Sequence, residues 1–337
     1  MEPDVWMKHI DDHYEYIATY VDDLMIASKN PKAITDELMN RFKFKLKGTG
    51  PLTFHLGCNY FRDEDGTLCV SPKKYIDRFL SSFNRLFGHN PCKKYRSPLE
   101  PNDHPELDMT DLLSTDDTVV YQSLIGGFQW AVSLGHIDLA VAVNTMSSFR
   151  ATPRKGHLDR VKRMCGYLSA KKSAAIRIRT EKPDYSSLQV PTFDWERIYG
   201  TVEEVIPDDI PEPLGKSVIT TTYLDANLLH CLATGRSVFG ILHMLNKTPA
   251  DWFSKKQSTA ETATYGSEFT VARTAVDQLV DIRLTLRYLG APVEGKAYAF
   301  GNNESVVTSA TIPHSKLNKR HNALSYHRVR EAIRSEE

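Results

Sequence analysis

The chain has 337 residues, of which 41% are hydrophobic and 25% are charged, so disorder, collagen and coiled coil are excluded as overall classes. Lys plus Arg and Asp plus Glu each number 42, and this neutrality by itself gives no sign of a nucleic-acid partner. Short apolar runs, a mixed N-terminus and five dispersed cysteines without a CxxC pair predict an intracellular protein that is neither secreted nor membrane-bound.

The N-terminal part of the chain is predicted to be a hairpin followed by helices. Aromatic and β-branched residues over 14–20 and apolar residues over 24–27 favour two strands joined by a short turn. The expected helices share a capping signal or a 3.6-residue apolar period, and they cover about residues 31–42, 72–87, 121–134, 137–149 and 153–168. This pattern indicates a hairpin attached to a helical subdomain.

Charge is unevenly distributed over the next part of the chain. Ten Lys or Arg and one acid lie between residues 150 and 179. Phosphate contacts are expected from a basic stripe that consists of Arg154, Lys155, Arg160, Lys162, Arg163, Lys171 and Lys172. A solvated helix face explains the same stripe equally well, so both interpretations stay open.

An acidic stretch follows the basic stripe. Nine acids and only two bases lie between residues 181 and 212, together with several prolines. Regular structure is hard to sustain in such a composition, which predicts a linker over 181–216. The linker divides the chain into a domain at 1–180 and a domain at 217–337.

The C-terminal domain changes its apolar period. The elements expected there are strands over 218–224, 237–245 and 250–254, a long helix over 260–289, a strand over 296–300, a short helix over 304–310 and a terminal helix from Asn322 onward. Three successive strands, a long helix and a further strand and helix describe a sheet with helical cover. The predicted fold class is therefore α/β (α+β).

Asp22 and Asp23 interrupt the otherwise apolar hairpin. A two-residue turn prefers Asn-Gly or Asp-Gly, and adjacent carboxylates repel each other unless a cation or solvent relieves them. Divalent cations bind carboxylate oxygens, so a metal and a phosphate substrate would suit this position. A solvent-exposed acidic turn is the alternative.

The chain resembles the reverse transcriptases of copia-type long-terminal-repeat retrotransposons. Tyr20-Val21-Asp22-Asp23 resembles the YVDD motif of their palm. The segments that match the family's motifs are, in chain order, Tyr20 to Leu24, Leu52 to Gly57, Tyr121 to Gly126 with Ile137 to Ala140, His157 to Leu168, Tyr223 to Ala226, Trp252 to Gln257 and Gly266 to Phe269. These matches run in the family's order over about 310 residues. The resemblance implies a Pol polyprotein fragment with the end of the palm, the thumb and connection, and ribonuclease H.

Two Mg²⁺- or Mn²⁺-dependent sites are implied by the resemblance. Asp22 and Asp23 are implied as catalytic metal ligands of a polymerase that uses deoxynucleotides when it is intact. Asp225, expected at the end of the first strand, and Glu268, expected a third of the way along the long helix, are implied as catalytic metal ligands of ribonuclease H. Taken alone, Asp225 is more simply a turn residue and Glu268 an exposed helix residue. The basic stripe is implied to bind RNA, RNA–DNA hybrid or DNA duplex, in the cytoplasm, in virus-like particles or in the nucleus.

The sequence also departs from the family's pattern. It starts just before the YVDD segment, so the fingers and the first palm aspartate are missing from it. Asn302 stands at the third ribonuclease H carboxylate and Ala323 at the fourth, although Glu304 is a conceivable substitute. We therefore expect this chain by itself to be inactive. Two hypotheses follow: a fragment of an RNA-directed DNA polymerase with ribonuclease H, or a nucleic-acid-binding remnant without catalysis. The sequence leaves the oligomeric state open.

Overall fold

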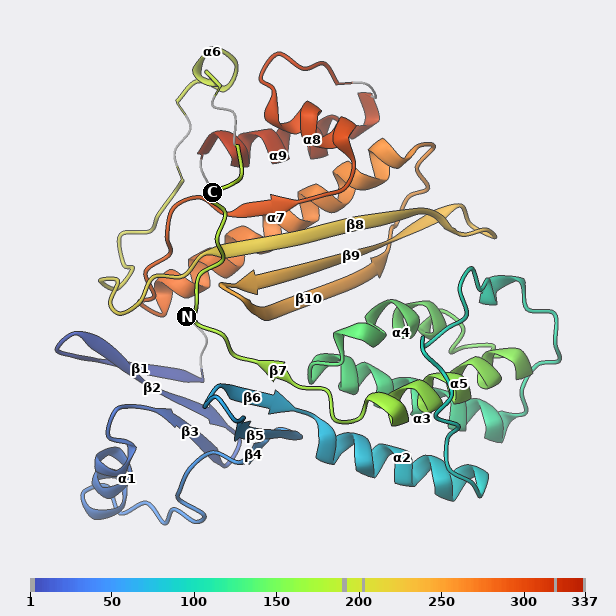
Figure 1. The fold of residues 1–337 in the computed structure, drawn as a ribbon, viewed down its shortest axis with the longest axis horizontal. Coiled ribbons are helices and arrows are strands. Elements are labelled where there is room, and N and C mark those ends of the chain that lie inside the picture. The colour runs from blue at the N-terminus through green and yellow to red at the C-terminus, as the bar shows by residue number, and fades with distance from the viewer. Residues whose placement is uncertain (1–3, 190–192, 202–203, 318–319, 336–337) are drawn as a thin grey trace.

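The computed structural model describes residues 4–189, 193–201, 204–317 and 320–335, and the chain folds into two halves (Figure 1). The lower half in Figure 1 combines two small sheets with a group of helices, and the upper half is a four-stranded sheet covered by helices. This mixture confirms the predicted α/β (α+β) fold class. Within the described residues, no helix has the length and apolar character needed to cross a membrane.

The first sheet contains the predicted hairpin. Its strands β1 (Val5–Ile10), β2 (His13–Tyr20) and β3 (Asp23–Ala27) are antiparallel neighbours, and α1 (Pro31–Asn40) follows them. Asn30 caps α1, because its side chain accepts a hydrogen bond from the Ala33 amide at 3.3 Å. No described residue from 4 to 57 is fully buried, so this part of the chain lies on one side of the main core.

The second sheet pairs the middle of the chain with a strand about a hundred residues later. Its strands, in spatial order, are β4 (Phe54–His55), β5 (Cys58–Arg62), β6 (Leu68–Ser71) and β7 (Ile176–Arg177). All pairs are antiparallel, and Cys69 lies opposite Arg177. This sheet therefore fastens the entry and the exit of the helical group to each other.

The main core lies among four helices. They are α2 (Lys73–Phe87), α3 (Thr115–Ser133), α4 (Ala140–Ser147) and α5 (Lys155–Lys171), with short 3₁₀ turns at Pro105–Leu107 and Ile137–Leu139. The apolar stripe of α2 points into this core through Ile76 and Phe83, and Gly88 ends the helix in a left-handed conformation, φ 72°. Tyr121 and Phe128 of α3 are fully buried against the same cluster.

The second half is built on one sheet in the order β10-β9-β8-β11. Its elements are β8 (Thr220–Cys231), β9 (Arg236–Leu245), β10 (Thr248–Lys256), α7 (Thr264–Tyr288), β11 (Tyr298–Phe300), α8 (Glu304–Thr311), a 3₁₀ turn at Arg320–Asn322 and α9 (Ala323–Ser335). β8, β9 and β10 are antiparallel, whereas β11 is parallel to β8. Phe269 of α7 is fully buried between the sheet side and α8 and α9.

The acidic segment lies against the second half. Its one helix within the described residues is the single turn α6 (Glu196–Tyr199). Tyr185 packs on the ring of Tyr298 with centroids 4.4 Å apart, and Glu204 forms an ion pair with Arg287. These contacts hold the segment on the surface of the second half. The role of residues 181–216 as a linker stays a prediction.

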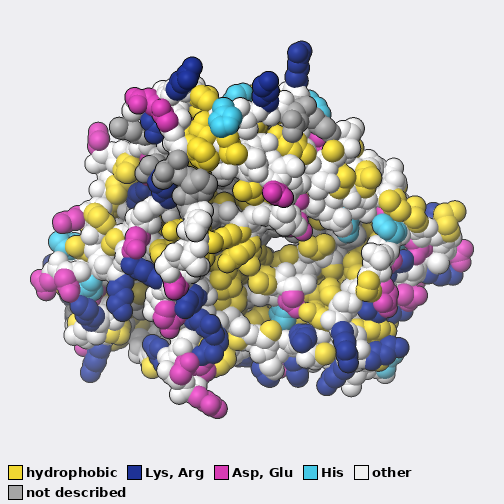
Figure 2. All heavy atoms as spheres, turned by 45° about the horizontal axis from the view of Figure 1, so that its top comes forward, with side chains coloured by type: hydrophobic (Ala, Val, Ile, Leu, Met, Phe, Trp, Pro, Cys, Tyr) yellow, Lys and Arg dark blue, Asp and Glu magenta, His cyan; other side chains and the backbone are white. Residues whose placement is uncertain are grey.

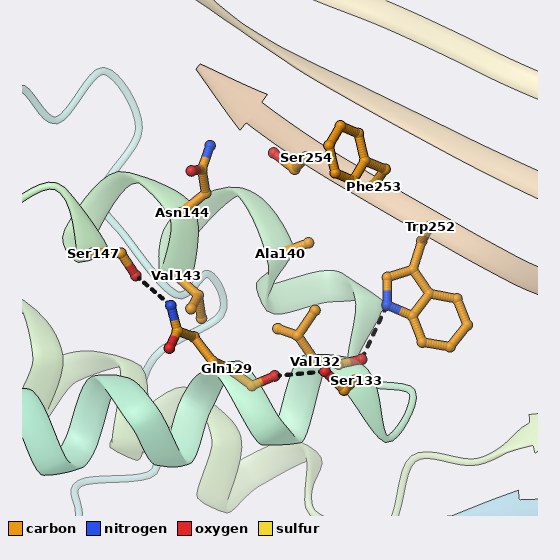
Figure 3. Close-up of a pocket in the computed structure, with 10 residues that line it drawn as sticks. All are labelled: Gln129, Val132, Ser133, Ala140, Val143, Asn144, Ser147, Trp252, Phe253 and Ser254. Carbon is orange, nitrogen blue, oxygen red and sulfur yellow. Dashed lines mark hydrogen bonds between the residues drawn. The ribbon is translucent and has the colours of Figure 1, made fainter. Parts of the chain in front are cut away.

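The two halves meet where α3 and α4 face β10. The indole Nε1 of Trp252 donates a hydrogen bond to the carbonyl oxygen of Val132 at 3.0 Å (Figure 3). A cavity of about 340 Å³ lies beside this contact and is lined by Gln129, Asn144, Ser147 and Ser254 among other residues. None of its lining residues is acidic or basic, so the cavity has no group suited to acid–base or metal chemistry.

The structure differs from the sequence-based expectations at several elements. The strands β1 and β4 to β7 were not expected, and α3 starts at Thr115 rather than near 121. β8 continues to Cys231, so the expectation that Asp225 ends the strand is wrong: it lies in the middle, opposite Gly240 of β9. Glu268 is the fifth residue of α7, closer to the helix start than expected, because α7 begins at Thr264.

Candidate functional site

Asp22 and Asp23 lie at the tip of the first hairpin. Tyr20 pairs with Asp23, which leaves Val21 and Asp22 as the two central turn residues. Val21 has a φ of 53°, a left-handed conformation that a β-branched residue adopts only at a cost of about 1–3 kcal/mol. The strained turn projects both carboxylates into solvent.

His55 lies beside this turn. The imidazole Nδ1 of His55 lies 3.6 Å from Oδ2 of Asp23, and the His55 ring meets the ring of Tyr20 edge-on. Among the described residues, no group of three or more His, Cys, Asp or Glu side chains is placed to hold a metal ion. The turn therefore has the carboxylates for a metal contact but lacks the third carboxylate that a two-metal polymerase site uses.

Asp225, Glu268 and Asn302 come from three segments and lie together on the sheet of the second half, beside the middle of β8 where its pairing with β11 has ended. Oδ1 of Asp225 accepts a hydrogen bond from the amide Nδ2 of Asn302 at 3.0 Å. Oε1 of Glu268 accepts one from the backbone amide of Ala226, the residue after Asp225, at 3.3 Å. Sequence positions 225, 268 and 302 thus converge as the resemblance implied, although their catalytic role stays a prediction.

Glu268 is the most perturbed group at this site. Its side chain is only 2% exposed, and Oε2 is buried without a hydrogen-bond partner. Burial, followed by repulsion from the Asp225 carboxylate, raises the pKa of Glu268 to about 7. The interpretation of Glu268 as an exposed helix residue is therefore wrong.

The start of α7 is held in place by close packing. A Cβ at Gly266 would lie 2.2 Å from Oε2 of Glu261 and 2.7 Å from Nδ2 of Asn322, so a larger residue would have to displace these two side chains. Oε2 of Glu261 also lies 3.0 Å from Nε2 of His321. This packing fixes the first turns of α7 and hence the position of Glu268 beside β8.

The site offers two carboxylates of the kind that a divalent cation binds, although among the described residues no group of three or more His, Cys, Asp or Glu side chains gathers here. Carboxylate oxygens of Asp225 and Glu268 are hard ligands, and the unpartnered Oε2 of Glu268 is free to bind an ion. Asn302 presents its amide nitrogen to Asp225, so it serves here as a hydrogen-bond donor and not as a ligand. Two ions about 4 Å apart need more negative charge than two carboxylates supply.

The two other positions implied for this site lie elsewhere. Ala323 is the first residue of α9 and lines a surface hollow of about 430 Å³ together with Arg273 and Asp277 of α7. Glu304 is exposed in the first turn of α8. Among the described contacts, none joins either residue to Asp225 or Glu268.

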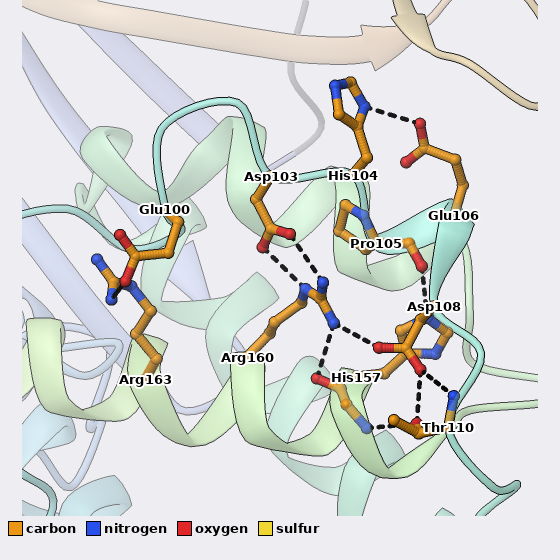
Figure 4. Close-up of polar contacts among 11 residues, drawn as sticks. Glu100, Asp103, His104, Pro105, Glu106, Asp108, Thr110, His157, Arg160 and Arg163 are labelled. Carbon is orange, nitrogen blue, oxygen red and sulfur yellow. Dashed lines mark hydrogen bonds and ion pairs between the residues drawn. The ribbon is translucent and has the colours of Figure 1, made fainter.

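The basic stripe is largely neutralised by acids of its own half. The guanidinium of Arg160 binds both carboxylate oxygens of Asp103 at 2.8 Å and Oδ2 of Asp108 at 2.6 Å (Figure 4). Arg163 is ion-paired with Glu100, and Lys155 with Asp111. The stripe thus serves mainly to fasten the loop over 100–111 to α5.

The remaining members of the stripe are also mostly engaged. Lys172 contacts Asp77 at 2.8 Å, and Lys162 lies 3.4 Å from Asp159. Arg154 donates a hydrogen bond to the carbonyl oxygen of Thr110 at the end of the same loop. Within the described residues, Lys171 is the one member of the stripe whose side chain has no hydrogen bond or ion pair. This arrangement leaves the stripe little free charge for phosphates.

The chain is similar in sequence to transposon proteins of yeast and plants. The chain is 26% identical over 259 residues to a transposon Ty5-1 protein of Saccharomyces cerevisiae, a match covering 76% of the chain and 70% of the yeast protein. It is 23% identical to the retrovirus-related Pol polyproteins of transposon RE1 from Arabidopsis thaliana and of transposon TNT 1-94 from Nicotiana tabacum, over 95% and 99% of the chain. The chain is a relative of Ty5/copia-type retrotransposon Pol polyproteins. The predicted resemblance is thereby confirmed.

The chain spans only 19% and 23% of the two plant Pol polyproteins, so it corresponds to a part of them. No family model and no solved structure matches the chain. The homology supports a fragment of a polyprotein with polymerase-related functions.

The sequence interpretation missed the acids that bind the stripe. The segment 100–111 contains five acids, and four of them contact the basic stripe: Glu100, Asp103, Asp108 and Asp111. This acidic cluster was visible in the sequence about fifty residues before the stripe. The opposite charges of the acidic segment 100–111 and the basic stripe, considered together, would have predicted that the two segments pair.

Proposed function

We propose that this chain is the part of a retrotransposon Pol polyprotein that runs from the end of the reverse-transcriptase palm, through the thumb and connection, to a ribonuclease H-like domain. In the intact polyprotein the region would act on RNA–DNA primer-template by two-metal chemistry. The homology to Pol polyproteins supports the origin, and a carboxylate pair on β8 and α7 supports the ribonuclease H-like assignment.

We infer that the chain by itself binds nucleic acid but neither cleaves nor extends it. The observation that argues against cleavage is the hydrogen bond from the Asn302 amide to Asp225, whereas the binding part rests on the homology to Pol polyproteins. The hydrogen bond puts a neutral donor where a third carboxylate would attract a second metal ion. Asp225 and Glu268 would hold one Mg²⁺ or Mn²⁺, which would polarise a phosphate oxygen when bound. The chain's own contribution is to position both carboxylates and to keep water away from Glu268.

The polymerase half supports the same conclusion. Asp22 and Asp23 are exposed on a strained turn, and a third carboxylate is not near them among the described residues. We expect no template-dependent incorporation of deoxynucleotides by the full chain with Mg²⁺ or Mn²⁺. Incorporation that Asp23→Asn abolishes would restore a polymerase role.

Cleavage and binding of an RNA–DNA hybrid test the proposal directly. We expect the full chain to retain a labelled 20-base-pair hybrid in a gel-shift assay, with an affinity that falls steeply with salt. We expect no RNA cleavage above a no-protein control over hours with either metal. Cleavage that Asp225→Asn abolishes would contradict the inactive site, and absence of any hybrid binding would contradict the nucleic-acid role.

A further inference from the structure

One exposed segment combines free cations with exposed aromatic rings. Residues 41–47 read Arg-Phe-Lys-Phe-Lys-Leu-Lys, and no acid occurs between residues 38 and 62. The Phe42 and Phe44 side chains are 54% and 59% exposed. Such rings are normally buried, because exposing them to water costs about 1.5–3 kcal/mol each. We call residues 41–47 the basic-aromatic segment.

The cations of this segment differ from those of the basic stripe. Lys43, Lys45 and Lys47 are exposed, and within the described residues none has a hydrogen bond or ion pair. Arg41 alone is engaged, since its guanidinium binds Glu37 at 2.8 Å and lies 5.1 Å from the centre of the Phe42 ring. Most of the segment's positive charge is therefore free, whereas nearly all of the charge on α5 is not.

The backbone presents these side chains at the end of α1. The amide of Phe44 donates a hydrogen bond to the carbonyl oxygen of Leu38 at 3.0 Å, and the amide of Phe42 donates one to that of Glu37. Between them Lys43 adopts a left-handed conformation, φ 60°, which is uncommon for a lysine. The fold holds this strained bend without burying either ring, as is common at binding surfaces.

We propose that the basic-aromatic segment is a binding site for single-stranded nucleic acid. Lys43, Lys45 and Lys47 would contact backbone phosphates, and Phe42 and Phe44 would stack on unpaired bases. An exposed ring has no access to the faces of bases in a duplex, so the arrangement selects single strands. Stacking and phosphate contacts do not read base edges, so little sequence preference is expected. The proposal adds a surface to the proposed function and does not depend on Asp225 or Glu268.

The gap between the two halves is less suited to this role. In Figure 2, hydrophobic side chains flank the gap between the two halves, and Lys and Arg side chains gather mainly along the lower part of the view. The cavity between α4 and β10 carries no positive charge. Free lysines alternating with exposed rings over a few residues set the basic-aromatic segment apart.

Fluorescence anisotropy of the full chain with labelled 20-nucleotide oligo-dT and oligo-rU tests the proposal. The charge variant is Lys43→Gln, Lys45→Gln and Lys47→Gln together. Each phosphate contact on a single strand contributes about 0.7 to the slope of log affinity against log salt, so the slope should fall by about 2. At 0.1 M salt this corresponds to a loss of affinity on the order of 100-fold.

The aromatic variant separates stacking from charge. Phe42→Ala with Phe44→Ala should weaken binding by about tenfold for each lost stack and leave the salt slope unchanged. Both rings are exposed, so this variant should fold normally, which circular dichroism will check. The matched control replaces three exposed lysines elsewhere, Lys93, Lys216 and Lys255, by Gln. It should bind within about twofold of the wild type.

Three results would overturn the proposal. The first is wild-type affinity and slope in the charge variant, and the second is an equal loss in the lysine control. The third is a wild-type chain that binds no oligonucleotide but dimerises through the segment, with Phe42→Ala and Phe44→Ala restoring the monomer in ultracentrifugation. Hybrid binding that persists while single-strand binding fails would reject this site alone and leave the proposed function intact.

Discussion

Replacing Glu268 by Gln should stabilise the chain at neutral and higher pH. Glu268 is 2% exposed, and one of its oxygens is buried without a partner. Burial and the nearby Asp225 carboxylate raise its pKa to about 7 from an ordinary value of 4.5. Gln keeps the shape and the hydrogen bond from Ala226 but carries no charge. The variant therefore removes the cost of ionising a buried acid.

The sign and the size of the effect follow from proton linkage. Between pH 4.5 and about 7 the unfolded chain loses the Glu268 proton while the folded chain retains it, so stability falls as pH rises through this window. At 1.36 kcal/mol per pH unit, the full loss is about 3 kcal/mol. The part of the sheet next to Asp225 is open to solvent, so we expect about 2 kcal/mol.

Urea unfolding followed by tryptophan fluorescence and circular dichroism measures this difference from pH 4.5 to pH 8. The free energy of unfolding of Glu268→Gln minus that of the wild type should be near zero at pH 4.5 and should reach about 2 kcal/mol at pH 8. Glu331→Gln, at an exposed position of α9, is the matched control and should show no such trend. A difference that does not change with pH would refute the argument from burial.

Three further outcomes are expected. Arg160→Ala should lower the free energy of unfolding by about 3 kcal/mol, because it removes the cation that binds both Asp103 and Asp108, whereas Lys171→Ala should change it by less than about 0.5 kcal/mol in the same urea titration. Mg²⁺ at 10 mM should raise the melting temperature of the wild type and not that of Asp225→Asn; equal shifts would place the ion elsewhere. In the hybrid-cleavage assay, Asn302→Asp should gain activity over the wild type by at least tenfold, and adding Ala323→Asp will show whether the fourth carboxylate is required.

Local signals in the sequence predicted much of the fold. The hairpin and the helices predicted over 31–42 and 72–87 each depend on residues close together in the chain, and the structure has the hairpin, α1 and α2 close to those bounds. The strands β4 and β7 were missed because each is two residues long, and β7 also pairs with β6, which lies about a hundred residues earlier. No apolar period develops over two residues, so only the tertiary contact creates such a strand.

The same limit applies to the candidate sites. Positions 225, 268 and 302 were identified through the resemblance, but the burial of Glu268 and the hydrogen bond to Asp225 come from contacts between β8, α7 and the loop after β11. The neutralisation of the basic stripe could also not be predicted from neighbouring residues, because Arg160 and its partner Asp103 are 57 residues apart. A run of lysines and arginines in the sequence shows that positive charge is present. Whether that charge is free to bind a phosphate depends on the acids that the fold brings close to it.

Asn302 affects both the stability of the second half and the negative charge of its proposed metal site. An aspartate at this position would face the Asp225 carboxylate at hydrogen-bond distance, and the two would repel unless a cation lay between them. The amide instead donates a hydrogen bond to Asp225, so this part of the sheet is stable without an ion. Compared with an aspartate, Asn302 therefore lacks the negative charge of a metal ligand. It also causes no repulsion with Asp225 that a metal ion would have to relieve. The proposed binding of single-stranded nucleic acid needs neither, because its free lysines and exposed rings lie on the other half, at the end of α1. The two proposed sites are thus on separate surfaces, and a change at Asn302 should leave binding at the basic-aromatic segment intact.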